Sequence, residues 1–228
     1  MNNNRLAKSD NHIGRPFNLE KLIAFKNLVF QSHPRKVYFV GDTFDLLWCT
    51  WADIMTNELS LRGYRIIMEI INYVSSYGGQ VFIIPGNHDE GIIRYAKDLA
   101  PAIITVPKIT DEGILFLHGH QFDVTINIAK KTINAVSEWL PFVGKKIWGT
   151  PAELKQSNEV QYTNLCGIMR QKVLNMARQR NINIIWGHTH QGEKQETPEG
   201  QQAVNCGDGI TENTYVIIKG NEINVRKL

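Results

Sequence analysis

The feature that most constrains the fold is a predicted buried strand that is followed directly by two carboxylates. Val37–Val40 is an uninterrupted apolar run, which is typical of a strand covered on both faces. Gly41 permits a sharp turn, and Asp42 and Asp45 follow it. Open α/β sheets hold ligands at the carboxyl ends of their strands, and no lysine or arginine adjoins Asp42. Because an isolated buried carboxylate is costly, we expect Asp42 to be solvated or to hold a cation.

The same pattern recurs three more times along the chain: an apolar run ends, and side chains carrying oxygen or imidazole nitrogen follow it. A further pair of this kind lies near the amino terminus. Of the seven histidines, only His33 lies outside these clusters, whereas histidines scattered through a core would not follow strand ends so closely. The groups are Asp10 and His12; Asn87, His88 and Asp89; His118 and His120; and His188 and His190.

Composition places the chain among ordinary globular proteins. Its 228 residues are 43% hydrophobic and 21% charged, which fits an α/β domain with an adequate core. We therefore expect a single domain over residues 1–228. The net charge of +3 is mild and no long run of like charges occurs, so electrostatics neither requires nor excludes an anionic partner.

Cysteine usage and hydropathy bear on the compartment. Cys49, Cys166 and Cys206 are odd in number and widely spaced, which argues against a disulfide framework and favours a reducing environment. The sequence shows no signal-peptide core and no run near the ~18 apolar residues of a spanning helix. We expect a cytoplasmic protein without a transmembrane anchor.

Periodicity predicts helices between the strands. Asn18 is a predicted cap for a helix before Pro34, and a second amphipathic helix is predicted over residues 57–77. Strand and helix cease to alternate after residue 123, where two helical patterns are predicted, about Val124–Leu140 and Val160–Arg180. The tail is predicted to form short strands, including a hairpin over residues 215–225. Leu6–Ser9 is short and partly polar, which makes it a poor candidate strand.

Seven of the clustered side chains offer carboxylate, amide oxygen or imidazole, and none offers a thiolate. That set suits manganese, iron, zinc or a similar divalent ion in a site with open positions, unlike a closed structural zinc site built on cysteine. Seven ligands are too many for one ion and about right for two if Asp42 bridges them. Two ions ~3.5–4 Å apart would clamp the oxygens of an in-line displacement at phosphorus and activate a bridging hydroxide, which predicts hydrolysis of a phosphoester or pyrophosphate. The seven are Asp10, His12, Asp42, Asn87, His118, His188 and His190.

These motifs resemble, in the same order, the five-motif signature of the calcineurin-like metallophosphoesterases. The resemblance spans residues 10–190 and implies an α/β/β/α sandwich of four layers, two mixed sheets flanked by helices, with a dinuclear metal centre. It implies one ion on Asp10, His12, Asp42 and His190, and a second on Asp42, Asn87, His118 and His188. It also implies that His88, paired with Asp89, stabilises the transition state or protonates the leaving oxygen. Asp45 is interpreted as a group that orients others rather than as a ligand.

Within that superfamily, His118–Asp123, the helical insertion and Asn205–Asp208 are most similar to the branch containing UDP-2,3-diacylglucosamine pyrophosphatase. In that branch the inserted helices form a cap over an acylated sugar nucleotide, so residues from about 123 to 180 are expected to be such a cap. We expect a small phosphoester or sugar-nucleotide substrate, peripheral contact with a membrane, and Mn²⁺ as the ion, with iron, zinc, nickel and cobalt as alternatives. The family commonly has an acidic residue where His120 stands, so a substrate contact and a loop role both remain open for this side chain.

Other functions remain open on the sequence. One is a phosphodiesterase acting on cyclic nucleotides or nucleic acid, although no basic stripe interleaved with aromatic residues favours a polynucleotide. A catalytically inactive metal-binding scaffold is another. Such a protein should lack a ligand or His88, and this sequence has them all.

Overall fold

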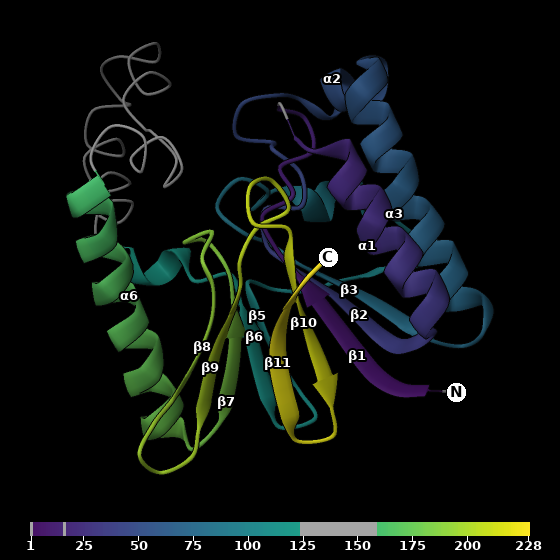
Figure 1. The fold of residues 1–228 in the computed structure, drawn as a ribbon. Coiled ribbons are helices and arrows are strands. Elements are labelled where there is room, and N and C mark those ends of the chain that lie inside the picture. Colours follow the sequence, from purple (N-terminus) through teal and green to yellow (C-terminus); the bar gives the residue numbers. More distant parts are fainter. Residues whose placement is uncertain (1, 16, 124–158) are drawn as a thin grey trace.

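Two β-sheets pack face to face, and helices cover the outer face of each (Figure 1). The computed structural model describes residues 2–15, 17–123 and 159–228. The first sheet has the strand order β11-β10-β1-β2-β3-β4, and β1 to β4 run parallel to one another. Its strands are β1 (Asn2–Lys8), β2 (Pro34–Val40), β3 (Gln80–Ile84), β4 (Ile103–Ile104), β10 (Thr214–Lys219) and β11 (Glu222–Lys227).

The second sheet has the order β5-β6-β7-β9-β8. Its three central strands, β6, β7 and β9, are parallel, and an antiparallel strand closes each edge. Both sheets are therefore mixed, as the sequence predicted. The strands are β5 (Lys108–Asp111), β6 (Ile114–Leu117), β7 (Asn183–Trp186), β8 (Gly192–Glu196) and β9 (Gln202–Cys206).

The helices begin where the sequence offers caps. The side chain of Asn18 accepts the backbone N–H of Lys21 at 3.1 Å, and that of Asn57 accepts the N–H of Ser60 at 3.0 Å. α1, α2 and α3 lie outside the first sheet, and α6 lies outside the second (Figure 1). The helices are α1 (Leu19–Ser32), α2 (Trp51–Thr56), α3 (Glu58–Ser76) and α6 (Glu159–Arg180), with the short 3₁₀ turns η1 (Ile92–Tyr95) and η2 (His120–Phe122).

Three apolar layers hold these four structural layers together. Phe25 of α1 and Ile67 of α3 are fully buried against the first sheet. Between the sheets, the rings of Tyr38 and Phe116 stack with centroids 4.0 Å apart. Val173 of α6 belongs to the third layer, against the second sheet. The predicted α/β/β/α sandwich is confirmed.

The amino-terminal strand is better formed than the sequence suggested. β1 pairs with β2 on one side and with β10 on the other. Lys8 is fully buried within it, and its ammonium group donates to the carbonyl of Thr214 at 3.1 Å. A polar residue is tolerated here because the far end of the chain supplies its acceptor.

The helical insertion is described only in part. The predicted helix over Val160–Arg180 is confirmed as α6, whereas the predicted helix over Val124–Leu140 lies outside the described residues. Among the described residues, no helix combines the length and the apolar character needed to cross a bilayer.

Candidate metal centre

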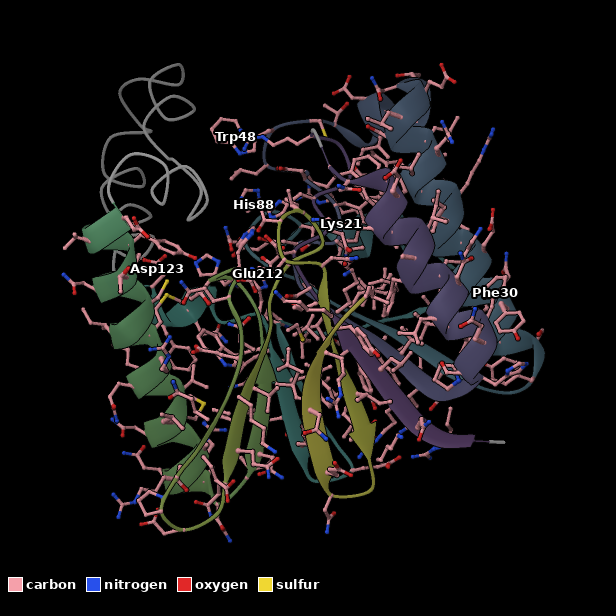
Figure 2. The ribbon with its side chains drawn as sticks, in the orientation of Figure 1. Lys21, Phe30, Trp48, His88, Asp123 and Glu212 are labelled. Carbon is pink, nitrogen blue, oxygen red and sulfur yellow. The ribbon has the colours of Figure 1, made fainter. Side chains whose placement is uncertain are left out.

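The clustered polar side chains follow parallel strands from both sheets. β1, β2 and β3 of the first sheet, and β6 and β7 of the second, all point their carboxyl ends at one edge of the sandwich (Figure 1). His88 and Asp123 lie at that edge (Figure 2). The fold therefore gathers at one place residues that are far apart in the sequence.

Hydrogen bonds between the loops fix the site. The carboxylate of Asp42 accepts the backbone N–H of His88 at 2.9 Å, and that of Asp10 accepts the N–H of His188 at 3.0 Å. The N–H of His12 donates to the carbonyl of Asp42 at 2.9 Å. Hydrogen bonds within the protein therefore hold each of these loops against its neighbours.

The backbone at the site is conformationally demanding. Among the described residues, nine that are not glycine have a positive φ, and five of these are predicted metal ligands. Left-handed backbone costs a residue with a side chain roughly 1–2 kcal/mol and persists where the surroundings impose it. Such strain is concentrated at functional sites. The five are Asp10 (54°), His12 (52°), Asp42 (50°), His188 (74°) and His190 (57°).

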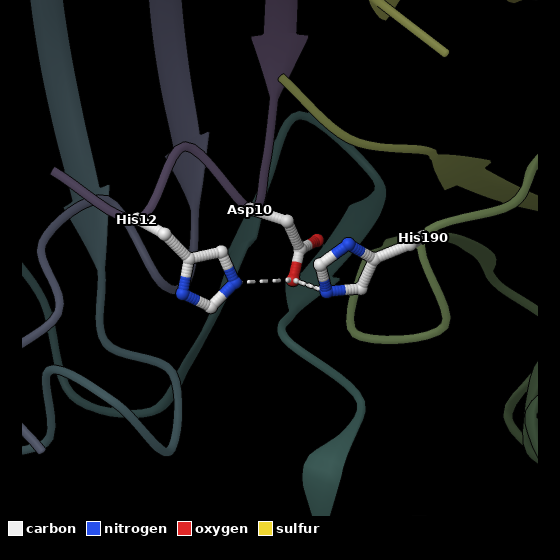
Figure 3. Close-up of side chains that lie close together, drawn as sticks. All are labelled: Asp10, His12 and His190. Atoms are coloured by element: carbon white, nitrogen blue, oxygen red, sulfur yellow. Dashed lines mark ion pairs between the residues drawn. The ribbon is translucent and has the colours of Figure 1, made fainter. Parts of the chain in front are cut away.

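The predicted ligands form two clusters that adjoin each other. Asp10, His12 and His190 offer atoms that all lie within 4.8 Å of one another (Figure 3). In this cluster, Oδ1 of Asp10 lies 3.4 Å from Nε2 of His190 and 3.9 Å from Nε2 of His12.

The second cluster consists of Asp42, His118 and His188, again with ligand atoms within 4.8 Å. Oδ2 of Asp42 lies 3.0 Å from Nε2 of His118 and 3.9 Å from Nε2 of His12. Because His12 belongs to the first cluster, Asp42 lies between the two. The structure thus places six of the seven predicted ligands in two neighbouring groups.

Several atoms in these clusters are buried without a hydrogen bond. They include Oδ1 of Asp10 and Nε2 of His12, and beside the clusters Oδ1 of Asn87, the seventh predicted ligand, has no hydrogen-bond partner among the described residues either. A buried polar atom that lacks a partner loses its hydration without compensation. Oxygen and imidazole nitrogen are suitable ligands for divalent transition metals, so this donor set fits metal ions.

The electrostatics of the second cluster also favour a cation. Burial opposes ionisation of Asp42, yet His118 and His88 hold the pKa of Asp42 well below its usual value. Burial lowers the pKa of His118, but Asp42 and Asp10 outweigh it and raise that pKa to about 10. The carboxylates thus retain a positive charge on a buried imidazole, and they would attract a metal ion in the same way.

His88 is paired with a carboxylate, but not with the one expected. Its Nδ1 lies 2.9 Å from Oδ1 of Asp45. The expected pairing with Asp89 is wrong, because the carboxylate of Asp89 turns into the protein. There it accepts the backbone N–H groups of Asp42, Thr43, Phe44 and Gly86. Burial and the nearby Asp42 raise the pKa of Asp89 to about 7, while these backbone bonds favour its charged form.

Asp45 orients two histidines at once. Besides His88, it lies 3.4 Å from Nδ1 of His12 through Oδ2. Its fully buried carboxylate also lies 3.5 Å from Nε of Arg15. A carboxylate on the far nitrogen of an imidazole fixes the orientation and tautomer of the ring.

Two further carboxylates do the same for the last pair of histidines, and the sequence assigned neither of them a role. Oδ2 of Asp208 lies 3.2 Å from Nδ1 of His190, and Oδ2 of Asp123 lies 3.0 Å from Nε2 of His188. Burial raises the pKa of Asp208, but the bond to His190 more than offsets this and holds it below its usual value. Asp208 follows a strand and a glycine, so the signal that pointed to Asp42 also marks Asp208.

His120 lies beside the second cluster. Its ring centroid is 5.6 Å from that of His118, and its Nε2 is 3.7 Å from Oε1 of Glu90. A contact between His120 and substrate stays a prediction.

An α/β/β/α sandwich with two adjoining histidine and carboxylate clusters at its strand ends is suited to hydrolysis of phosphoesters with divalent metal ions. The chain belongs to the calcineurin-like phosphoesterase family, whose family model matches residues 6–192. That range includes every predicted ligand but excludes Asp208.

Other known proteins give more distant likenesses. None of the curated proteins is a significant match to this sequence. A protein from Thermus thermophilus covers 100% of this chain and 99% of its own, with 12% identity and a TM-score of 0.48. The match to a dimetal phosphatase from Danio rerio covers 98% of this chain and 95% of the phosphatase, with 9% identity and a TM-score of 0.45. The match to the nuclease MPE of Pseudomonas putida covers 91% of this chain and 76% of the nuclease, with 12% identity and a TM-score of 0.43.

Proposed function

We propose that this phosphoesterase hydrolyses a pyrophosphate or phosphodiester bond at a dinuclear metal centre, and that its substrate is an acylated UDP-sugar of the kind cleaved by UDP-2,3-diacylglucosamine pyrophosphatase. The observation that carries the chemistry is the pair of adjoining clusters, with Asp42 between them. The substrate class is supported by the similarity of residues 118–123 and 205–208 to that branch.

Asp10, His12, Asp42 and His190 would hold one ion, and Asp42, Asn87, His118 and His188 the other. Bound ions would neutralise the charge on phosphate oxygens. They would also lower the pKa of a bound water molecule, so that hydroxide is available as the nucleophile at neutral pH. The chain positions the groups around them. Asp45, Asp123 and Asp208 fix the imidazole rings through the nitrogens that face away from the ions.

His88 would protonate the leaving oxygen. Burial lowers the pKa of His88, but Asp42 and Asp45 more than offset it and raise that pKa above its ordinary value, which favours the protonated form. Because Nδ1 is bonded to Asp45, Nε2 is the nitrogen left to face the substrate. In hydrolysis, the oxygen of water bonds to phosphorus, the bond from phosphorus to the leaving oxygen breaks, and His88 supplies the proton that this oxygen takes up. Asp89 would contribute by holding the loops of Asp42 and Asn87 in place.

The remaining parts of the proposal concern the domain organisation, the identity of the metal ion and the cellular location of the protein. The whole chain would act as one domain, since β10 and β11 of the tail complete the sheet that begins with β1. Of the cap predicted over about residues 123–180, α6 instead packs against the outer face of the second sheet, so the proposed cap is confined to the residues that precede α6. Manganese would serve as the ion in the cytoplasm, where the three free cysteines would stay reduced. Peripheral contact with a membrane would bring the enzyme to an acylated substrate.

Phosphorus NMR on the full-length protein with Mn²⁺ tests this proposal. The substrates would be an acylated UDP-sugar, the same sugar nucleotide without acyl chains, a cyclic nucleotide and a short DNA. We expect two monophosphate products from the acylated UDP-sugar and the slowest turnover on DNA. Asp42→Asn should abolish hydrolysis, whereas Asp98→Asn, at an exposed carboxylate, should leave it unchanged. Preference for DNA would refute the substrate, and wild-type turnover by Asp42→Asn would refute the chemistry.

A further inference from the structure

The turn that carries His188 and His190 contributes to both metal clusters. His190 belongs to the cluster of Asp10, and His188 belongs to the cluster of Asp42. Thr189, which is 1% exposed, separates the two histidines in the chain. The conformation of this turn therefore helps to determine how far apart the two clusters lie.

The backbone of this turn needs support from outside it. Its histidines have left-handed backbone, with φ of 74° at His188 and 57° at His190, and such conformations persist where the surroundings impose them. Within the turn, the N–H of Thr189 donates to the carbonyl of Gly187 at 3.0 Å. The carbonyl oxygens of Gly187 and Thr189 accept hydrogen bonds from side chains on two other elements.

One of these supports comes from β9, in the second sheet. Asn205 is fully buried, and its Nδ2 donates to the carbonyl of Gly187 at 3.1 Å and to Oγ1 of Thr189 at 2.9 Å. Its Oδ1 accepts the backbone N–H of Gly207 at 2.8 Å. Asn205 thus holds the turn from the side of the sheet.

The other support comes from α6. Residues three or four apart along this helix are buried and form a stripe on one face, as expected for a helix packed on a sheet. Tyr162 begins the stripe, is 1% exposed, and donates its hydroxyl proton to the carbonyl of Thr189. Burial raises the pKa of Tyr162, so the hydroxyl keeps the proton that it donates. The stripe consists of Tyr162, Cys166, Met169, Val173 and Ala177.

α6 also contacts the segment that orients the ring of His188. Nζ of Lys172 donates to the carbonyl of Phe122 at 3.1 Å. The next residue, Asp123, lies 3.0 Å from Nε2 of His188 through Oδ2. The helix therefore supports both the backbone and the imidazole of this predicted ligand.

We infer that Tyr162 is a positioning residue which, together with Asn205, fixes the turn between His188 and His190 and thereby sets the spacing of the two metal ions. This inference rests on the dinuclear centre of the proposed function. Phenylalanine would fill the same place in the buried stripe, whereas tyrosine adds a donor that reaches the turn. A buried hydroxyl needs a partner in any protein, so a role in metal binding has to be separated from a role in stability alone.

Tyr162→Phe removes the hydroxyl and keeps the ring. Titration calorimetry of the metal-free protein should show Mn²⁺ binding weakened about threefold to tenfold, the range expected for the loss of one hydrogen bond. In protein loaded with Mn²⁺, electron paramagnetic resonance should show an altered exchange coupling between the two spins. That coupling depends on the distance between the ions and on the groups that bridge them, and a change in fold stability alone would leave it unchanged.

Tyr77→Phe is the matched control. The hydroxyl of Tyr77 donates to the carbonyl of Pro34 at 3.0 Å, at the start of β2 and thus at the end of that strand remote from the metal centre. Both variants lose a hydrogen bond from a tyrosine to a carbonyl, so both should have a lowered melting temperature. Tyr77→Phe should keep the wild-type Mn²⁺ affinity and exchange coupling.

Wild-type Mn²⁺ affinity and exchange coupling in Tyr162→Phe would overturn the inference, even with a lowered melting temperature. If circular dichroism shows that Tyr162→Phe does not fold, Thr189→Val decides in its place. This variant removes the Oγ1 atom that Asn205 binds and leaves the carbonyl groups of the turn. It should show the same loss of affinity and an altered coupling, and wild-type values for both would again overturn the inference.

These measurements also distinguish the inference from the proposed function. If no phosphoester or pyrophosphate is hydrolysed while Tyr162→Phe still weakens Mn²⁺ binding and alters the coupling, the proposed hydrolysis fails and the positioning role stands. If the wild type hydrolyses its substrate while Tyr162→Phe binds both ions as the wild type does, only the positioning role fails.

Discussion

Asp208→Asn tests whether a carboxylate outside the family match positions a metal ligand. Oδ1 of Asp208 accepts the backbone N–H groups of Thr211 at 2.8 Å and Glu212 at 2.7 Å, and an asparagine carbonyl can replace it. Oδ2 faces Nδ1 of His190 at 3.2 Å, and asparagine would place an NH₂ group there. His190 would then have to accept at Nδ1 and carry its proton on Nε2, the nitrogen that faces Asp10.

The expected loss of metal affinity follows from that change of tautomer. Removing a carboxylate from the outer nitrogen of a metal-bound histidine costs about 10–100-fold in affinity, which corresponds to roughly 1.4–2.8 kcal/mol. Titration calorimetry of the metal-free protein with Mn²⁺ measures this loss without reference to turnover, and nitrogen NMR of the imidazole reports the tautomer. Asp98→Asn is the control. An Mn²⁺ dissociation constant within about twofold of the wild type would refute the positioning role, since it falls far below this range.

Three further substitutions follow from the structure. His88→Gln should lower kcat by about 10²–10⁴-fold while two metal ions remain bound, and metal analysis beside a turnover assay checks both; loss of metal would contradict the separation of roles. Gly86→Ala should abolish Mn²⁺ binding in calorimetry, because the added methyl group would collide with the carboxylate of Asp42; normal binding would show that the loop can shift. The hydrogen bond from Arg35 lowers the pKa of Glu112 from 4.5 to about 2, so this carboxylate stabilises the fold above pH 4.5 and loses that effect as the pH falls toward 2. Glu112→Gln should therefore flatten the pH dependence of the melting temperature in that range, and an unchanged slope would argue against the ion pair.

Much of the fold could be predicted from local sequence because each element carries its own signal. Continuous apolar runs that end in glycine predicted β2 and β3, and the periodicity with a cap predicted α1 and α3. β1 gave no such signal. It is stabilised by pairing with β10 and by the bond from Lys8 to Thr214, which lies 206 residues away. No local pattern contains such a partner.

The candidate site was also predicted in part: the residues that converge were predicted, but several of the hydrogen bonds between them were not. The sequence predicted that seven ligands would converge, because parallel strands align their carboxyl ends, and the structure places six of them in two clusters. It did not predict that His88 would bond to Asp45 rather than to Asp89. Asp89 is next to His88 in the sequence, whereas Asp45 is close to it only in the folded structure. The conformation of the loops determines which of the two carboxylates faces the imidazole. The bond from Asp123 to His188 was missed for the same reason. Asp208 follows a strand and a glycine, as Asp42 does, so its place at the site could be predicted from the sequence, whereas its partner His190 could not.

The count and position of bound ions test the central claim most directly. A crystal of the full-length protein loaded with Mn²⁺, with diffraction data collected at the manganese absorption edge, should show two anomalous peaks. We expect one peak among Asp10, His12 and His190, the other among His118, His188 and Asn87, and Asp42 in contact with both. A single ion, or ions bound away from these side chains, would contradict a dinuclear centre.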